Sequence, residues 1–163
     1  MSPLLKTLAA SAAILVLSSS ARAQGLVTEK NLSLGMALTI AQAALQKCES
    51  LGFKVSVAVV DRAGLTLVAL RGDGAGLHTP EGADRKAYTA RTYRSPSANF
   101  AKRVVSDPSY APAEQYQRVL ALAGGLPIKA GNEVVGAVGV SGSPGQDDVC
   151  SQAGIDKVAD QLK

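Results

Sequence analysis

Two short apolar runs joined by a tight turn constrain this chain more than any other feature. In residues 55–60 valines alternate with Ser56 and Ala58, and residues 65–70 are almost entirely apolar. Between the runs lies Asp-Arg-Ala-Gly, a composition typical of a turn. Alternation bounded by turn residues predicts a β-hairpin. Because both strands are so apolar, we expect them to be covered on at least one face and to lie at the centre of a sheet.

A glycine-rich loop and a helix start follow the hairpin. Residues 72–76 read Gly-Asp-Gly-Ala-Gly, which is too rich in glycine for a strand or a helix. Thr79 is a favourable N-cap, and Pro80 suits the first helical position. We therefore predict a helix from about Pro80 to Pro96, with His78 and the glycine loop at its N-terminal end.

The rest of the pattern predicts further helices and a second hairpin. In chain order we expect a helix at 33–52, a short helix and irregular loop at 97–113, strands at 119–123, 128–130 and 133–140, and a helix starting at Asp147. Ala83, Ala87 and Ala90 give the helix after the glycine loop a face of small side chains, which can approach the sheet closely. This order indicates an α+β fold with an antiparallel sheet.

Residues 1–23 have the composition of a secretory signal. Lys6 supplies the positive charge, residues 8–17 are apolar, and Ala-Arg-Ala at 21–23 matches a cleavage site. The alternative is a retained transmembrane helix, which needs about 20 apolar residues. Cleavage would leave residues 24–163, a length suited to a single domain, in the periplasm or outside the cell. Two basic residues would leave with the signal, so the 17 of the full chain become 15 against 13 acidic ones.

The two cysteines lie on the first and last predicted helices of the exported chain. Exported proteins meet an oxidising environment. We therefore expect Cys48 and Cys150 to form one intramolecular disulfide; the alternative is that both are small buried hydrophobic residues.

Familiar catalytic motifs are missing from the sequence. It contains no Cys-x-x-Cys, no histidine pair and no cluster of acids at metal-ligand spacing, which argues against a zinc site within one chain. The glycines of residues 72–76 match neither G-x-G-x-x-G nor a Walker A motif, so a flexible or close-packed connection is the stronger interpretation than a nucleotide loop.

His78, the only histidine, and the basic segment after it are the candidate binding residues. A lone imidazole beside a glycine loop can bind a metal or haem iron, although it can equally be a surface residue before a helix. Six basic residues and one acid lie between Asp84 and Arg103. That local excess favours a small anionic ligand such as a carboxylate, the alternative being a solvated helix face. The export signal and the few aromatic residues argue against nucleic acid.

Four segments carry a family resemblance. At VAVVDRAGLTLVALRGDGAG, HTPEGADRKAYTA, GGLPIKAGNEVVGAVGVSG and CSQAGIDKV the chain resembles the GlcG/HbpS family of haem-binding proteins, over nearly all of residues 24–163. The resemblance implies a profilin-like or PAS-like five-stranded antiparallel sheet packed with α-helices, assembled into homo-oligomers. The family is similar to the C-terminal domain of PduO-type cobalamin adenosyltransferases, which also binds haem. Secreted members are associated with iron handling and redox sensing beside a membrane sensor kinase.

Haem is the cofactor that this resemblance implies. His78 matches relatives in which a histidine binds the iron, and Thr89 and Thr92 are the candidates if a threonine does. Arg85 and Lys86 are expected near the propionates. The leading hypothesis is thus an exported, non-catalytic haem-binding protein. The alternatives are an enzyme of small-molecule metabolism that uses His78 and the glycine loop, and a small-molecule binding or sensor-partner module.

Overall fold

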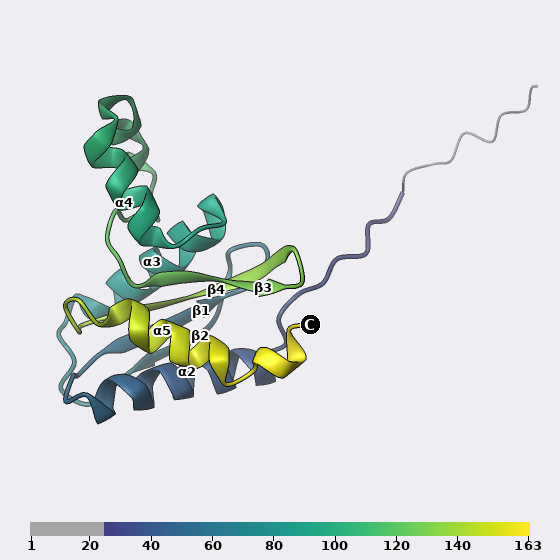
Figure 1. Ribbon diagram of the computed structural model, residues 1–163, viewed down its shortest axis with the longest axis horizontal. Helices are drawn as coiled ribbons and strands as arrows, with labels where there is room; N and C mark the ends of the chain where they lie inside the picture. The colour runs from purple at the N-terminus through teal and green to yellow at the C-terminus, as the bar shows by residue number, and fades with distance from the viewer. Residues whose placement is uncertain (1–24) are drawn as a thin grey trace, which may run out of the picture.

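The computed structural model describes residues 25–163, so the expected signal segment at residues 1–23 lies outside the described residues. The elements are α2 (Leu34–Ser50), β1 (Ser56–Val60), β2 (Thr66–Arg71), α3 (Thr79–Tyr93), α4 (Ser97–Ser106), η2 (Pro108–Gln115), β3 (Gly125–Ala130), β4 (Glu133–Ser141), α5 (Asp147–Asp156) and η3 (Ala159–Gln161). Figure 1 shows α2 and α5 side by side on one face of an antiparallel sheet and α3 on the other. The fold is α+β, as predicted.

The sheet of the described residues has four strands in the order β2-β1-β4-β3. Val59 of β1 pairs with Val68 of β2 on one side and with Val138 of β4 on the other. The predicted hairpin is confirmed, and β1 is buried along its whole length. The expectation that both of its strands are central is wrong for β2, which is an edge strand in which only Val68 is buried.

The expected strand at residues 119–123 does not form, so the sheet has four strands rather than five in the part of the chain described. Val119 is buried, but its carbonyl accepts a hydrogen bond from Arg85. The Leu120 amide donates to the Thr89 hydroxyl. Side chains of α3 thus form the hydrogen bonds to this backbone that a neighbouring strand would otherwise form. The next strand, β3, begins at Gly125, earlier than predicted, and carries Pro127 on the sheet edge, where a proline is tolerated.

The two faces of the sheet differ in side-chain size. On β4, Val138 and Val140 belong to the core cluster shared with α2 and α5, whereas Ala137 packs with the alanines of α3. This is the alternation expected along a strand. A Cβ at Gly139 would collide with the Ala83 carbonyl. The backbone of α3 therefore lies directly against the backbone of β4. The small-residue face predicted for this helix is confirmed.

A disulfide joins the two helices on the larger-residue face. Cys48 of α2 and Cys150 of α5 are bonded, with Cα atoms 5.5 Å apart, and neither side chain is exposed. The predicted pairing is therefore confirmed. No helix within residues 25–163 is both long enough and apolar enough to span a bilayer.

The segment from α4 through η2 projects away from the sheet (Figure 1). Only Ser97 and Phe100 of α4 are buried, and no residue of η2 is. Phe100 attaches the segment to the body by stacking on Tyr93, with ring centroids 4.4 Å apart. We call residues 97–115 the projecting lobe.

Candidate functional site

A cavity of about 590 Å³ lies where the N-terminal ends of α3 and α5 meet the end of β4. We call it the α3–α5 cavity. His78 and Thr79 line it from α3, Asp147 lines it from α5, and Lys54 lies on its wall beside them. Volumes of this order are usual for small-molecule sites.

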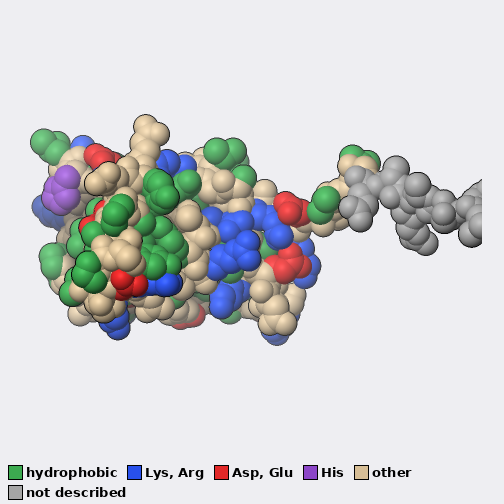
Figure 2. Space-filling model, turned by 90° about the horizontal axis from the view of Figure 1, so that it is seen from above, with side chains coloured by type: hydrophobic (Ala, Val, Ile, Leu, Met, Phe, Trp, Pro, Cys, Tyr) green, Lys and Arg blue, Asp and Glu red, His purple; other side chains and the backbone are tan. Residues whose placement is uncertain are grey.

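His78 lies at the edge of the cavity, just before α3. The helix begins at Thr79, one residue earlier than predicted, so that His78 rather than Thr79 is the N-cap. The imidazole is exposed and caps no amide of the helix. Thr79 is instead buried, and its hydroxyl contacts the Ser56 hydroxyl at 2.8 Å and donates to the Gly76 carbonyl. Figure 2 shows the histidine at the surface.

Lys86 lies deeper in the same cavity and is only 4% exposed. Its ammonium donates to the Asp147 carboxylate at 2.7 Å, to the Val140 carbonyl at 3.1 Å and to the Ser141 hydroxyl at 3.4 Å. An ammonium has three hydrogens to donate, and all three have partners here. Lys86 is therefore a buried, compensated cation, and a ligand carboxylate could bind it only by displacing or sharing one of these acceptors.

Asp147 is the acid that compensates Lys86. Its second oxygen accepts from the Ser143 amide at 2.9 Å and from the Ser143 hydroxyl at 2.6 Å. It is also the first residue of α5, where a negative charge is stabilised by the helix dipole. Sequence reasoning predicted Asp147 only as a helix start and missed its role in the cavity. The two partners are 61 residues apart, so no local spacing connects them.

Arg85 and Thr89 bind the segment after the projecting lobe instead of lining the cavity. The Arg85 guanidinium donates to Glu81 at 3.1 Å and to the Val119 carbonyl at 2.8 Å. The Thr89 hydroxyl is fully buried; it donates to the Arg85 carbonyl and accepts from the Leu120 amide. The structure thus brings His78 and Lys86 together on one cavity and places Arg85 and Thr89 outside its lining.

The remaining candidates on α3 lie further along the helix. Thr92 is exposed. Burial lowers the pKa of Arg91, and the positive charges of Arg94 and Arg62 lower it further. The Nε atom of Arg91 is buried without a hydrogen-bond partner. The basic residues after His78 therefore do not form one site. Lys86 lines the cavity, Arg85 bonds the Val119 carbonyl, and Arg91 and Arg94 lie further along the chain, outside the cavity lining.

The glycine loop at residues 72–76 forms a closed connection. The Gly72 amide donates to the Val55 carbonyl, the Ala75 amide donates to the Gly72 carbonyl, and the Arg71 guanidinium donates to the Ala75 carbonyl at 2.6 Å. Amides used in this way are not directed at a phosphate. Across residues 25–163 no group of three potential metal-binding side chains converges.

Comparison with known proteins identifies the family of the chain. The family model described as haem degrading protein HbpS-like matches residues 32–156, a range that contains the whole α3–α5 cavity. The chain belongs to the HbpS-like family. Among HbpS-like structures, a double mutant of HbpS from Streptomyces reticuli is 41% identical with a TM-score of 0.77, covering 84% of this chain and 93% of that one.

Two further relatives extend the comparison. The crystal structure of a PduOC:haem complex is 27% identical with a TM-score of 0.71, over 77% of this chain and 94% of that one. An uncharacterised 15.0 kDa protein encoded in the dhaT-dhaS intergenic region of Citrobacter freundii is 33% identical, over 72% of this chain and 84% of its own length.

Proposed function

We propose that this HbpS-like protein is an exported haem-binding protein that holds haem in the α3–α5 cavity. The observation that carries the proposal is the position of His78, the only histidine in the chain, exposed on the wall of that cavity and free of a capping role. A neutral imidazole is a common ligand of haem iron. The relative whose structure is a haem complex supports the same ligand.

The cavity wall also fits the carboxylates of such a ligand. Lys54 is exposed on the wall and takes part in none of the ion pairs formed by residues 25–163. Lys86 lies deeper, with Asp147 already bound to it. We therefore assign the propionate-binding role to Lys54 first and Lys86 second. Arg85, which the sequence favoured for this role, lies outside the cavity lining.

Export is the second part of the proposal. It is supported by the signal-like composition of residues 1–23 and by a disulfide, which persists in oxidising compartments. Assembly into a homo-oligomer and a membrane sensor as partner are further proposals that rest on the family resemblance.

A haem titration of purified residues 24–163, followed at the Soret band, tests the binding site. We expect His78→Ala to move the Soret maximum and to weaken binding by at least about tenfold, which is about 1.4 kcal/mol. Lys54→Ala should weaken binding without moving the band, and Thr92→Ala should change neither. An unaltered spectrum for His78→Ala would remove His78 as the ligand. Failure of the unaltered sequence to bind haem would refute the function itself.

The haem complex formed in this titration can also be tested for turnover. The test matters because the family description names haem degradation. We propose a non-catalytic role, so the Soret band should persist when a reductant and oxygen are added to the complex. Progressive bleaching above that of haem bound to an unrelated protein would instead establish a haem-degrading enzyme.

A further inference from the structure

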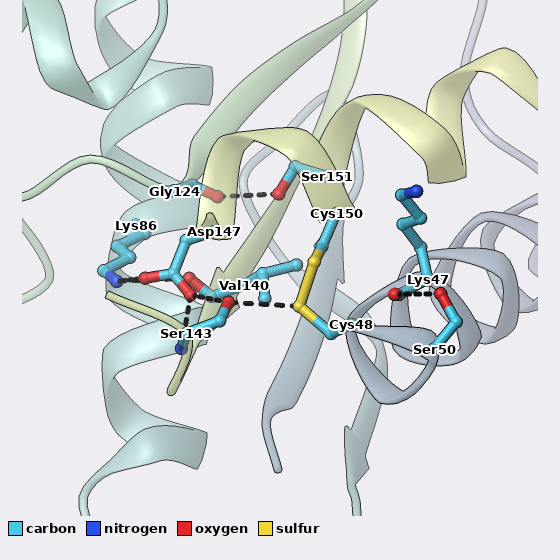
Figure 3. Close-up of a disulfide and its surroundings, with 10 residues drawn as sticks. All are labelled: Lys47, Cys48, Ser50, Lys86, Gly124, Val140, Ser143, Asp147, Cys150 and Ser151. Atoms are coloured by element: carbon cyan, nitrogen blue, oxygen red, sulfur yellow. Dashed lines mark hydrogen bonds and ion pairs between the residues drawn. A yellow bond between two sulfur atoms is a disulfide. The ribbon is translucent and has the colours of Figure 1, made fainter. Parts of the chain in front are cut away.

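A continuous chain of buried polar contacts links the disulfide to the α3–α5 cavity (Figure 3). Cys48 Sγ lies 3.1 Å from the Ser143 hydroxyl, which donates to Asp147 Oδ1 at 2.6 Å. The other oxygen of Asp147 accepts from Lys86 at 2.7 Å. All four residues are buried, and the last two line the cavity.

The disulfide also fixes the backbone that forms this wall. Asp147 and Cys150 are three residues apart at the start of α5, so they lie on neighbouring positions of one helix face. The turn before Asp147 lines the cavity through Pro144 and Gly145. On the other side of Cys150, the Ser151 hydroxyl donates to the Gly124 carbonyl at 2.7 Å. The start of α5 therefore fixes the turn before Asp147 and contacts Gly124, which follows the lining residues Leu122 and Ala123. Cys150 ties this part of α5 to α2.

In the reduced chain the two sulfurs cannot keep these positions. Unbonded thiols stay further apart than bonded sulfurs, because van der Waals repulsion replaces the covalent bond. Both sulfurs are fully buried, and without the bond only packing contacts hold the start of α5 against α2. Movement of α5 would displace Asp147 and the turn before it.

We propose that formation of the Cys48–Cys150 disulfide completes the α3–α5 cavity, so that the protein becomes competent to bind its ligand only after oxidation. The identity of the ligand rests on the proposed function, whereas the coupling of the bond to the wall does not. In the forming step, one cysteine thiolate attacks a disulfide reagent to give a mixed disulfide. The thiolate of the second cysteine then displaces the reagent. The reagent accepts two electrons and both thiol protons and leaves as a dithiol.

Because the bond is buried, we expect it to form once during maturation and to stay closed in the folded protein. A reductant must reach a sulfur atom to open a disulfide, and neither sulfur is exposed in the folded protein. A chain kept reduced in a thiol-rich compartment would have an incomplete cavity. If the chain is exported, ligand loading follows export and oxidation.

Hydrogen exchange of the Ser143 and Gln146 amides tests the coupling without any ligand. Both amides are hydrogen-bonded within the wall. In a Cys48→Ala/Cys150→Ala variant they should exchange at least about tenfold faster relative to the amides of the central, buried strand β1, which report overall stability. Ser143→Ala, which keeps the disulfide but cuts the polar chain, should accelerate Gln146 several-fold. Ser50→Ala is the matched control, because its hydroxyl bonds only the Lys47 carbonyl on α2; it should change nothing.

Haem affinity gives the second readout. It should fall at least about tenfold in the cysteine variant and several-fold in Ser143→Ala. An equal acceleration of the wall and of β1, or an unchanged affinity in a folded cysteine variant, would overturn the inference. If the cysteine variant does not fold, Ser143→Ala decides, and unchanged exchange at Gln146 refutes the coupling. Absence of haem binding by the unaltered sequence would refute the proposed function while leaving the exchange result to judge the coupling.

Discussion

Two positions on α3 carry similar basic side chains in opposite states. In the middle of the helix, Lys86 is buried and has an acceptor for each of its three hydrogens. Near the C-terminal end, Arg91 and Arg94 take part in no ion pair among the described residues. Thirteen positions separate His78 from Arg91, which is about 20 Å along a helix. A run of basic residues in a sequence therefore does not define one binding surface.

Helix geometry explains the difference. Lys86 adjoins Ala87 on the face that packs against β4, so its ammonium is carried into the protein and needs an acid there. Arg94 ends the helix in the left-handed conformation and is exposed. Neither Arg91 nor Arg94 lines the α3–α5 cavity. The unpaired arginines and the candidate ligand cavity are thus different parts of the surface.

The largest expected effect is at the buried position, Lys86. Lys86→Met should lower the free energy of unfolding by about 3–5 kcal/mol, because it leaves the Asp147 carboxylate buried without its cation. Arg94→Met, at the exposed end, should stay within about 0.5 kcal/mol. Urea denaturation measures both. Equal effects of the two substitutions would break the comparison, and partial recovery in Lys86→Met/Asp147→Asn would strengthen it.

A smaller effect distinguishes the two threonines. Thr89→Val should cost about 1–3 kcal/mol, because the Leu120 amide loses its acceptor in a partly buried setting. Thr92→Val should be nearly neutral, since Thr92 is exposed. Denaturation gives the stability, and exchange at the Leu120 amide locates the change. A stable Thr89→Val protein with a protected Leu120 amide would show that this bond does not hold the segment.

The smallest effect concerns Arg62, which neighbours Arg91. Its hydrogen bond to Glu133 lowers the pKa of that carboxyl below the ordinary 4.5. A lowered pKa in the folded state means that the contribution to stability is present above pH 4.5 and is lost as the pH falls through the folded value. Both groups are solvent-accessible, so the effect on stability should be slight. Carboxyl NMR should find the pKa of Glu133 below 4.5 in the unaltered protein and closer to 4.5 in Arg62→Gln. An equal Glu133 pKa in the two proteins would show that the Arg62–Glu133 pair does not form.

Local patterns were sufficient for much of the fold. The β1–β2 hairpin, the start of α3 and the β3–β4 turn follow from alternation, capping residues and glycines within a few positions of one another. The disulfide was predictable because two cysteines have only one internal pairing and the sequence suggested export to an oxidising compartment. His78 stood out as the only histidine, which is a property of composition and needs no structure.

The rest depended on contacts between distant residues. Residues 119–123 have the composition of a strand, yet Arg85 and Thr89 satisfy the backbone there. β2 is as apolar as β1 but lies at the edge, because β4, from the far end of the chain, pairs with the other side of β1. The charge state of the cavity follows from the Lys86–Asp147 pair, which only the folded chain brings together.

The disulfide has a consequence for damage as well as for folding. The two cysteines are 102 positions apart, and all four strands and the projecting lobe lie between them. Exposed segments with few buried residues are the preferred sites of proteolysis, and the lobe is such a segment. A protease cut at the lobe would leave both fragments joined through the sulfurs, with α3 and β4 still packed together. The nicked molecule would run as two bands only after reduction and would keep its cavity.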